Sequence, residues 1–312
     1  MSTIRLGLDT ARDYLHAPFI GISQLVPLQS GGDLQLVYPG PDETPRSLLT
    51  EGKVDLAVMS LAEVFMAHAD GDPLWGVGRI SAGFSGLVVD SRVSEPSVCS
   101  TVGLSFGVRR WVDRRLLRAL IQDIWLSQFC TGPEADVKMV PADGDITARF
   151  LDGHLDSVCL LDANLVLSGL SFLGRTVHAW GPNGCRVVPL GDRVLAFRRL
   201  PDGTLPNDLG SKVSDVHQAL RALAELARVQ PSRLHNAWYA EVGGATLQPF
   251  QRAMLDSVVS SIPWDATISL SYLQSIADWL RFRGLPSPSA NALPWIDPYS
   301  EVLRAVPSGE AI

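Results

Sequence analysis

The chain has 312 residues, of which 46% are hydrophobic and 19% are charged, and its formal net charge is -7. This length suits two lobes of roughly 100 to 150 residues each, and the composition is typical of a folded protein, not a disordered one. The negative charge argues against a nucleic-acid partner, because binding to a polyanion needs a basic face.

The sequence also bears on location and metal content. Its apolar runs fall far short of the roughly 20 residues of a membrane-spanning helix, so we predict no membrane span. The N-terminus enters a strand directly and does not resemble a secretory leader. We therefore expect a cytoplasmic protein, or a periplasmic or extracellular one if a leader has been removed. The four cysteines are widely spaced and form no Cys-x-x-Cys pair, which predicts neither a bound metal nor a redox dithiol.

The first part of the chain alternates strands with helices. A strand over 4–9 leads through a polar loop, 10–16, to an apolar segment starting at Pro18, a residue suited to the first turn of a helix. We expect a second strand at 34–38, a helix at about 43–51, a strand after Gly52 and a helix at about 61–69. This βαβα order predicts a mainly parallel sheet.

One short pattern occurs twice, as Gly52-Lys-Val-Asp55 and as Gly153-His-Leu-Asp156. Each copy is typical of a helix end, a glycine in a left-handed cap, a short apolar strand and the start of another helix. The sequence therefore predicts two similar α/β units in one chain.

The segment 74–90 is long and strand-like, and we expect it to carry the chain to a second lobe. That lobe should contain strands at 102–105, 137–140 and 157–161 and helices at 109–129 and 146–151, before the segment 187–199 returns. Helices follow at 213–228, 232–241, 248–260 and 270–282, and the tail from Pro286 should wrap the surface. The predicted lobes are residues 1–85 plus 192–312 and residues 86–191.

Five segments, in this order, resemble type II periplasmic-binding-protein folds, specifically the group of nitrate-, sulfonate- and taurine-binding proteins and thiamin-pyrimidine-precursor proteins. They are Leu8-Asp9 with His16-Ala17-Pro18-Phe19, Gly52-Lys53-Val54-Asp55, Val102-Gly103-Leu104 with Trp111-Val112-Asp113, Gly153-His154-Leu155-Asp156, and Asp278-Trp279-Leu280 with Gly284-Leu285. The resemblance implies an α/β fold of two lobes with mainly parallel sheets and a ligand cleft between the lobes.

The same resemblance implies that the ligand is held by the loop after the first strand and by strand-to-helix turns. On this sequence these positions are Asp9, Thr10, Tyr14, His16, Phe19, Ser60, Leu61, Glu63, Ser105, Phe106, Arg109, Asp162 and Asn164. Ser105 and Arg109 are expected at a helix start, where free N–H groups favour an anion. The rings of Tyr14, Phe19 and Phe106 could sandwich a flat ligand.

Each assignment has a purely structural alternative. His16 could brace the helix that starts near Pro18, and Phe19 and Phe106 could belong to the core. Glu63 and Asp162 could stabilise helix N-termini without any ligand. The arginines of the predicted helix could form a solvated face or one anion site, and either Arg109 or Arg110 could point inward.

An enzymatic function needs its own residues. The pyrimidine-precursor synthases of this group carry a Lys, and a His four residues later, where this chain has Met59 and Glu63, and a cysteine-rich iron-binding run where it has Cys185 alone. The three lysines lie in polar or flanking positions, so we predict no pyridoxal-phosphate role and no cofactor. General acid–base chemistry by His16 with Asp9, Asp13 or Glu63 stays open.

We therefore carry two main hypotheses. The first is a small-molecule-binding protein, similar to solute-binding proteins, that closes on an organic anion or a flat heterocycle; it would have a transporter partner only if a leader is missing. The second is a cofactor-independent cytoplasmic biosynthetic enzyme of the decarboxylase, cyclase or lyase type on the same scaffold. A ligand-sensing or scaffolding role through the helical C-terminal third is a third possibility.

Overall fold

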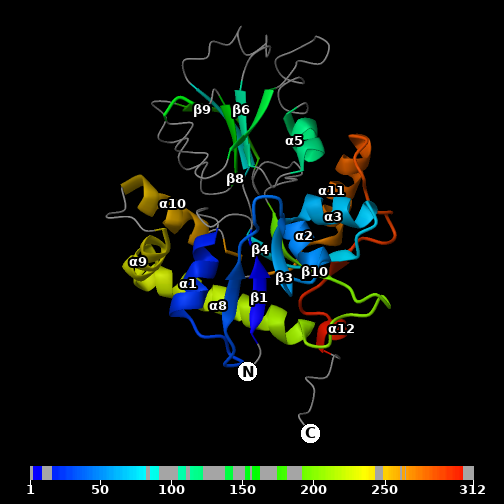
Figure 1. The fold of residues 1–312 in the computed structure, drawn as a ribbon, viewed down its shortest axis with the longest axis horizontal. Helices are drawn as coiled ribbons and strands as arrows, with labels where there is room; N and C mark the ends of the chain where they lie inside the picture. Colours follow the sequence, from blue (N-terminus) through cyan, green and yellow to red (C-terminus); the bar gives the residue numbers. More distant parts are fainter. Residues whose placement is uncertain are drawn as a thin grey trace.

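The computed structural model shows two β-sheets with helices around them (Figure 1). It describes residues 3–8, 16–81, 85–90, 105–109, 113–121, 138–142, 152–154, 157–161, 174–180, 192–242, 249–260, 262–263 and 265–304.

Within the described residues, the first sheet has six strands in the order β11-β4-β10-β3-β1-β2. Their bounds are β1 Ile4–Gly7, β2 Leu34–Val37, β3 Leu56–Ser60, β4 Leu74–Ser81, β10 Arg193–Arg198 and β11 Trp295–Ile296. β1 pairs in parallel with β2 and β3, whereas β10 is antiparallel to β3 and β4. β11 pairs in parallel with β4, so the C-terminal tail, which we expected to wrap the surface, contributes an edge strand.

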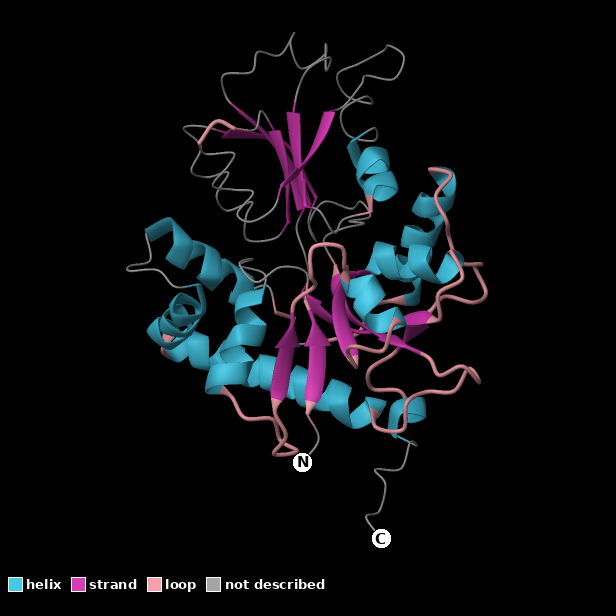
Figure 2. Ribbon diagram, viewed as in Figure 1, coloured by secondary structure: helices cyan, strands magenta, loops and turns pink. Residues whose placement is uncertain are grey.

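Helices cover both faces of this sheet (Figure 2). Their bounds are α1 Ala17–Leu25, α2 Pro45–Thr50, α3 Leu61–Ala69, α8 Leu209–Val229, α9 Pro231–Val242, α10 Pro249–Ser260, α11 Leu270–Phe282 and α12 Glu301–Arg304. The chain moves from β1 in one direction to β2 and then back past β1 to β3, so right-handed crossovers place α1 and α2 on opposite faces. Accordingly, α1 packs with α8, α9 and α10, while α3 packs with α11.

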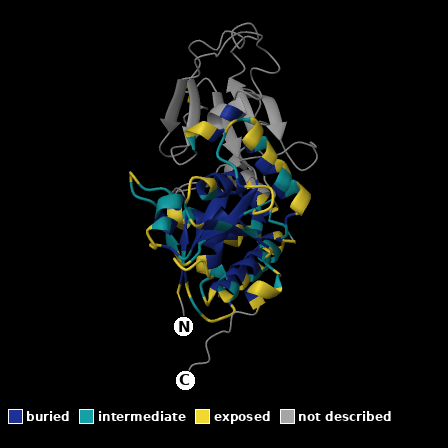
Figure 3. Ribbon diagram, turned by 90° about the vertical axis from the view of Figure 1, so that its right-hand side faces the viewer, coloured by how far each residue is buried: buried dark blue, intermediate teal, exposed yellow. Residues whose placement is uncertain are grey.

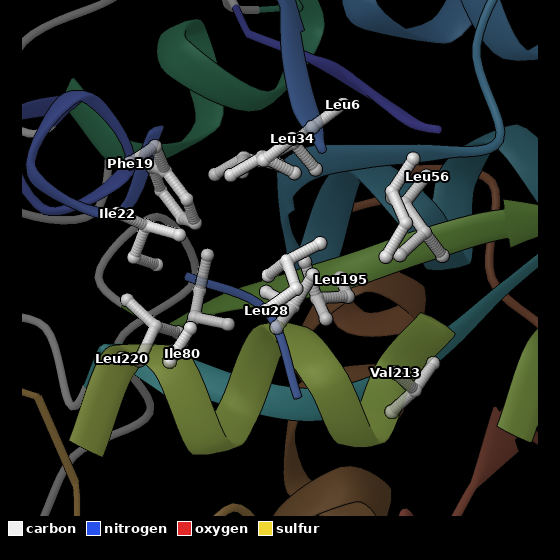
Figure 4. Close-up of a cluster of buried hydrophobic side chains, with 14 of the residues drawn as sticks. Leu6, Phe19, Ile22, Leu28, Leu34, Leu56, Ile80, Leu195, Val213 and Leu220 are labelled. Carbon is white, nitrogen blue, oxygen red and sulfur yellow. The ribbon is translucent and has the colours of Figure 1, made fainter. Parts of the chain in front are cut away.

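The hydrophobic core of this unit lies between the sheet and the α1 and α8 helices (Figure 4). Leu6, Leu34 and Leu56 of the strands belong to it together with Ile22 of α1 and Leu220 of α8. All five residues of β3 are buried, as expected for a strand with helices on both faces. Buried positions therefore fill the centre of this unit (Figure 3).

Within the described residues, the second sheet has five strands in the order β7-β6-β8-β5-β9. Their bounds are β5 Ser85–Asp90, β6 Ser105–Arg109, β7 Lys138–Ala142, β8 Ser157–Leu161 and β9 Gly174–Trp180, and helix α5, Arg114–Ile121, follows β6. β6 is parallel to β7 and β8, and β5 is antiparallel to β8 and β9. The predicted α/β fold with mainly parallel strands is confirmed.

The two sheets share one topology. In each, the first strand of a parallel trio lies between the second and third, as β2-β1-β3 and β7-β6-β8, and an antiparallel strand pairs with the third. The repeated glycines precede the third strand of each trio and adopt left-handed conformations, with φ of 71° at Gly52 and 75° at Gly153. The predicted pair of related α/β units, each with a left-handed glycine cap, is therefore present in the fold.

The chain passes between the sheets twice, after β4 and before β10. Strands of the first sheet come from residues 4–81 and 193–296, and those of the second from residues 85–180. The lobe boundaries that we place at 85/86 and 191/192 stay a prediction. The predicted helix at 146–151 lies outside the described residues.

Asp55, in the first copy of the repeat, joins three elements. It accepts hydrogen bonds from the backbone N–H of Arg5, at 2.8 Å, and from the Arg5 side chain, and pairs with Lys212 Nζ of α8 at 3.1 Å. Burial raises the pKa of this carboxyl, but the bonds from Arg5 and Lys212 outweigh it and hold the pKa below the usual value. The Asp of the repeat is therefore part of the scaffold.

We expect Asp55→Asn to lower the free energy of unfolding by about 1 to 3 kcal/mol, the usual cost of weakening a charged, partly buried hydrogen-bond centre. Urea unfolding at pH 7 measures it. Asp208→Asn is the matched control, because Asp208 also pairs with Lys212, at 2.7 Å, but is 51% exposed; its cost should stay within about 1 kcal/mol. Equal losses in the two variants would contradict a special role for Asp55.

Candidate functional site

The carboxyl ends of β1 and β3 form a topological switch point. The connections after these two strands leave toward opposite faces of the sheet, and in open α/β sheets ligands bind at such a position. The loop after β1, with the predicted ligand residues Asp9, Thr10 and Tyr14, lies outside the described residues. Its far end, at His16, is described and lies at this edge.

His16 is the N-cap residue of α1 and is fully buried, yet its side chain makes no capping hydrogen bond. Pro18 lies in the first turn, as predicted. The His16 ring faces Tyr38, the residue after β2, with ring centroids 6.3 Å apart and planes tilted by 47°. This aromatic pair therefore joins the carboxyl ends of β1 and β2.

Ser60 and Glu63 form a capping box at the start of α3. The Ser60 hydroxyl donates to Glu63 Oε2 at 2.7 Å, and the Glu63 backbone N–H donates to Ser60 Oγ at 3.2 Å. Burial raises the pKa of Glu63 to about 7, against the opposing effects of the Ser60 hydrogen bonds and the Arg193 charge. The side chains of both residues are thus engaged in holding the helix.

A buried polar network that we did not predict lies beside this capping box. Arg193 opens β10 opposite Ser60 of β3 and is 3% exposed. The neighbouring Asp192 accepts a hydrogen bond from the Tyr272 hydroxyl, and its Oδ1 lies 3.7 Å from Arg79 Nη1. A charged pair at the head of the apolar strand 194–197 is the sequence signal that could have identified it.

Contacts with the first turn of α5 bring the end of β6 to this edge. The backbone amide of Asp113 lowers the pKa of Glu63, although less than Ser60 and Arg193 do. Arg115 Nη2 lies 2.8 Å from Asp70 Oδ2, at the end of α3. Glu63 follows β3 by three residues and Asp113 follows β6 by four. The segments that follow β3 and β6 are therefore neighbours.

The predicted helix start at Ser105 and Arg109 is wrong. The segment Ser105–Arg109 is strand β6, which includes Phe106 and pairs in parallel with β7. The helix begins at Arg114, after Asp113, whose Oδ1 accepts the Arg115 backbone N–H at 2.8 Å in the manner of an N-cap residue. The boundary between β6 and α5 is hard to predict from the sequence, because arginines lie on both sides of it and arginine favours helix. A contact of Ser105, Phe106 or Arg109 with a ligand stays a prediction.

Two further predicted contacts belong to the packed interior. Phe19 is 2% exposed and lies next to Ile22 in the core (Figure 4), as our alternative for it stated. Leu61 is fully buried, and its backbone N–H donates to the Asp192 carbonyl at 3.0 Å. Asp162 and Asn164 lie outside the described residues.

A separate pocket of about 410 Å³ lies between α8 and α10. Three of its charged lining residues form ion pairs: Arg228 Nη2 lies 3.0 Å from Glu225 Oε2, and Asp256 Oδ1 lies 2.8 Å from His235 Nε2. The pocket shares none of the described residues at the carboxyl ends of β1 and β3, so it is separate from the candidate site there.

Among the described residues, no group of three His, Cys, Asp or Glu side chains is arranged to hold a metal ion. In the same part of the chain, no helix has the length and apolar character needed to cross a membrane.

Comparison with known proteins agrees with this architecture. A family model described as "NMT1/THI5 like" matches residues 29–177. A Haemophilus influenzae protein, provisionally named for thiamine biosynthesis, is 23% identical over 274 residues, covering 84% of this chain and 80% of the relative.

Solved structures extend the likeness over nearly the whole chain. The alkanesulfonate-binding protein of Xanthomonas axonopodis pv. citri, bound to MOPS, matches with a TM-score of 0.62 and 15% identity over 95% of this chain and 99% of its own. The ligand-binding component of an ABC-type import system from Staphylococcus aureus, with zinc bound, matches with a TM-score of 0.62 and 13% identity over 99% and 100%. The chain therefore has the two-lobed periplasmic-binding-protein fold and resembles the NMT1/THI5-like family.

Proposed function

We propose that the protein binds a small molecule between the carboxyl ends of its two parallel trios and that its lobes close on that ligand. The observation that carries the proposal is the contact of Asp113 and Arg115, just beyond β6, with Glu63 and Asp70 of α3. Ligands of open α/β folds bind at the carboxyl ends of parallel strands, and small-molecule sites are common where two such units adjoin.

An organic anion or a flat heterocycle is the ligand class that we propose. Buried Arg193 and the partly buried Arg79 place positive charge at the edge of the first sheet, and β6 ends at Arg109. The partly buried Tyr38 ring, which packs against the fully buried His16, supplies flat apolar surface at the same edge. The solved relative bound to MOPS, itself an organic sulfonate, supports the anionic alternative.

A cofactor-independent enzyme is the second candidate, and one observation favours it. Burial brings the pKa of Glu63 to about 7, a value suited to proton transfer at neutral pH. The capping box, however, accounts for this carboxyl without any reaction. Binding is therefore the function that we prefer, and turnover is an outcome of the test.

The test is calorimetric titration of the purified protein, in phosphate buffer, with MOPS and with an aminopyrimidine. We expect saturable binding of at least one probe, weakened about tenfold, or roughly 1.4 kcal/mol, by His16→Gln, because the variant removes the buried ring that packs against Tyr38 at the proposed site. His68→Gln is the matched control, because His68 contacts Trp75 and the Leu74 carbonyl, at the amino end of β4.

Three other outcomes of the titration would count against parts of the proposal. Unchanged affinity in His16→Gln, with a native circular dichroism spectrum, would remove His16 from the site. The absence of saturable binding for both probes would contradict the proposed ligand class. Chemical change of a probe, followed by nuclear magnetic resonance, would favour the enzyme.

A further inference from the structure

Arg115 connects the helix after β6 with the helix after β3. Its Nη2 lies 2.8 Å from Asp70 Oδ2, and its Nη1 lies 3.5 Å from Asp70 Oδ1, so the guanidinium meets both carboxylate oxygens. The same Nη2 lies 2.8 Å from Asp113 Oδ2 at the start of α5. Hydrogen bonding to Arg115 is the largest influence that lowers the pKa of Asp70. Arg115 therefore joins a carboxylate of α3 to one of its own helix.

The first sheet does not need this ion pair for its own folding. Asp70 has a second partner in Arg46 of α2, whose Nη1 lies 3.2 Å from Asp70 Oδ2 and whose Nε pairs with Asp72. If Arg115 is removed, Asp70 keeps a cation from its own side. The N-cap bond of α5 is also retained, because it uses the Arg115 backbone N–H. What the Arg115 side chain adds is a connection between units that belong to different sheets (Figure 1).

We propose that Arg115 is a positioning residue of the binding site, an inference that rests on the proposed function. Its ion pair with Asp70 holds the start of α5 against α3, and with it the carboxyl end of β6. α5 begins five residues after β6 ends, and α3 begins directly after β3. Asp70 caps the far end of α3, and Glu63 in the first turn of α3 meets the Asp113 backbone. The pair therefore keeps the start of α5 aligned along α3, which fixes the spacing between the segments that follow β3 and β6. Arg115 acts through these elements and is not itself a ligand contact.

The physics of the pair suits positioning more than stability. The Arg115 side chain is 47% exposed, and ion pairs at that exposure contribute little to the free energy of unfolding. A bidentate guanidinium–carboxylate contact nevertheless restricts the distance and the angle between the two side chains. Loss of the Arg115–Asp70 ion pair should therefore let the two lobes adopt a wider range of relative positions, while both lobes stay folded.

The test combines small-angle X-ray scattering without ligand and calorimetric titration with MOPS at low salt. In Arg115→Gln and in Asp70→Asn we expect a larger radius of gyration and a three- to tenfold weaker affinity. The double variant should be no worse than either single variant, because both remove the same interaction. Arg115→Lys, which keeps the charge, should recover part of both effects. Arg46→Gln is the matched control and should change neither.

Two results would overturn the proposal. Unchanged scattering in Arg115→Gln would show that the pair does not set the lobe arrangement. Equal changes in Arg46→Gln would place the effect of Asp70 within the first unit. The scattering needs no ligand, so expansion in Arg115→Gln would support the structural role of the pair even if the wild-type protein binds no MOPS, a result that would count against the anionic ligand and not against the ion pair.

Discussion

Gly78→Ala is expected to destabilise the protein by at least about 4 kcal/mol, far beyond the usual cost of one added methyl group. Gly78 has a φ of 65°, and a Cβ at this position would lie 2.0 Å from Cε1 and 2.6 Å from Nε2 of His217. His217 is 7% exposed on α8 and has little room to withdraw. The variant therefore combines a left-handed backbone, costing about 1 to 2 kcal/mol, with a collision inside the core.

The local pairing explains why a glycine is needed here. β4 and β10 shift register next to Gly78: Val77 lies opposite Leu195 and Arg79 lies opposite Val194. Gly78 is thus the extra residue of a bulge, a place where glycine commonly takes a left-handed conformation. The bulge leaves the space that the His217 ring fills.

Urea unfolding at pH 7 separates the two contributions. Gly203→Ala is the matched control, because Gly203 has a φ of 80° but an added Cβ there would have no neighbouring atom within 4 Å; it should cost only about 1 to 2 kcal/mol. Adding His217→Ala to Gly78→Ala should relieve the collision and leave the backbone cost. A loss in Gly78→Ala no greater than in Gly203→Ala would refute this account of the packing.

Local signals make part of the fold predictable. The helix predicted over 61–69 has its observed bounds, because Ser60 and Glu63 form a capping box in the sequence itself. The repeat alone identifies Gly52 and Gly153 as left-handed caps. The strand β11 escapes prediction, because two residues at a sheet edge have no periodicity to detect.

The candidate site is less predictable, because much of it depends on contacts between distant segments. β10 inserts between β3 and β4, more than 110 residues away in sequence, and carries Arg193 to Ser60. The pairing of Arg115 with Asp70 likewise joins helices of different sheets. Sequence reasoning locates His16, Ser60 and Glu63 at strand ends, but the partners that surround Glu63 follow only from the topology.

Two buried groups are expected to give stability opposite pH dependences that largely cancel. Burial raises the pKa of Glu63 from 4.5 to about 7. Between these values the native state keeps a proton that the unfolded state has released, so stability falls as the pH rises. Burial, with the charge of Arg221, lowers the pKa of His217 from 6.5 to about 4. The unfolded state binds the extra proton here, so stability rises with pH.

Each single variant should expose the contribution of the other group. The free energy of unfolding of Glu63→Gln, relative to wild type, should rise as the pH increases from about 4.5 to 7. That of His217→Gln, relative to wild type, should fall as the pH increases from about 4 to 6.5. Each change should be about 3 kcal/mol, at 1.36 kcal/mol per pKa unit. Urea unfolding from pH 4.5 to 8 measures both differences, in which the contributions of other carboxyls cancel. The double variant should return to the wild-type slope, since it removes both opposing groups. Single-variant curves parallel to wild type would mean that neither carboxyl nor imidazole titrates as its burial requires.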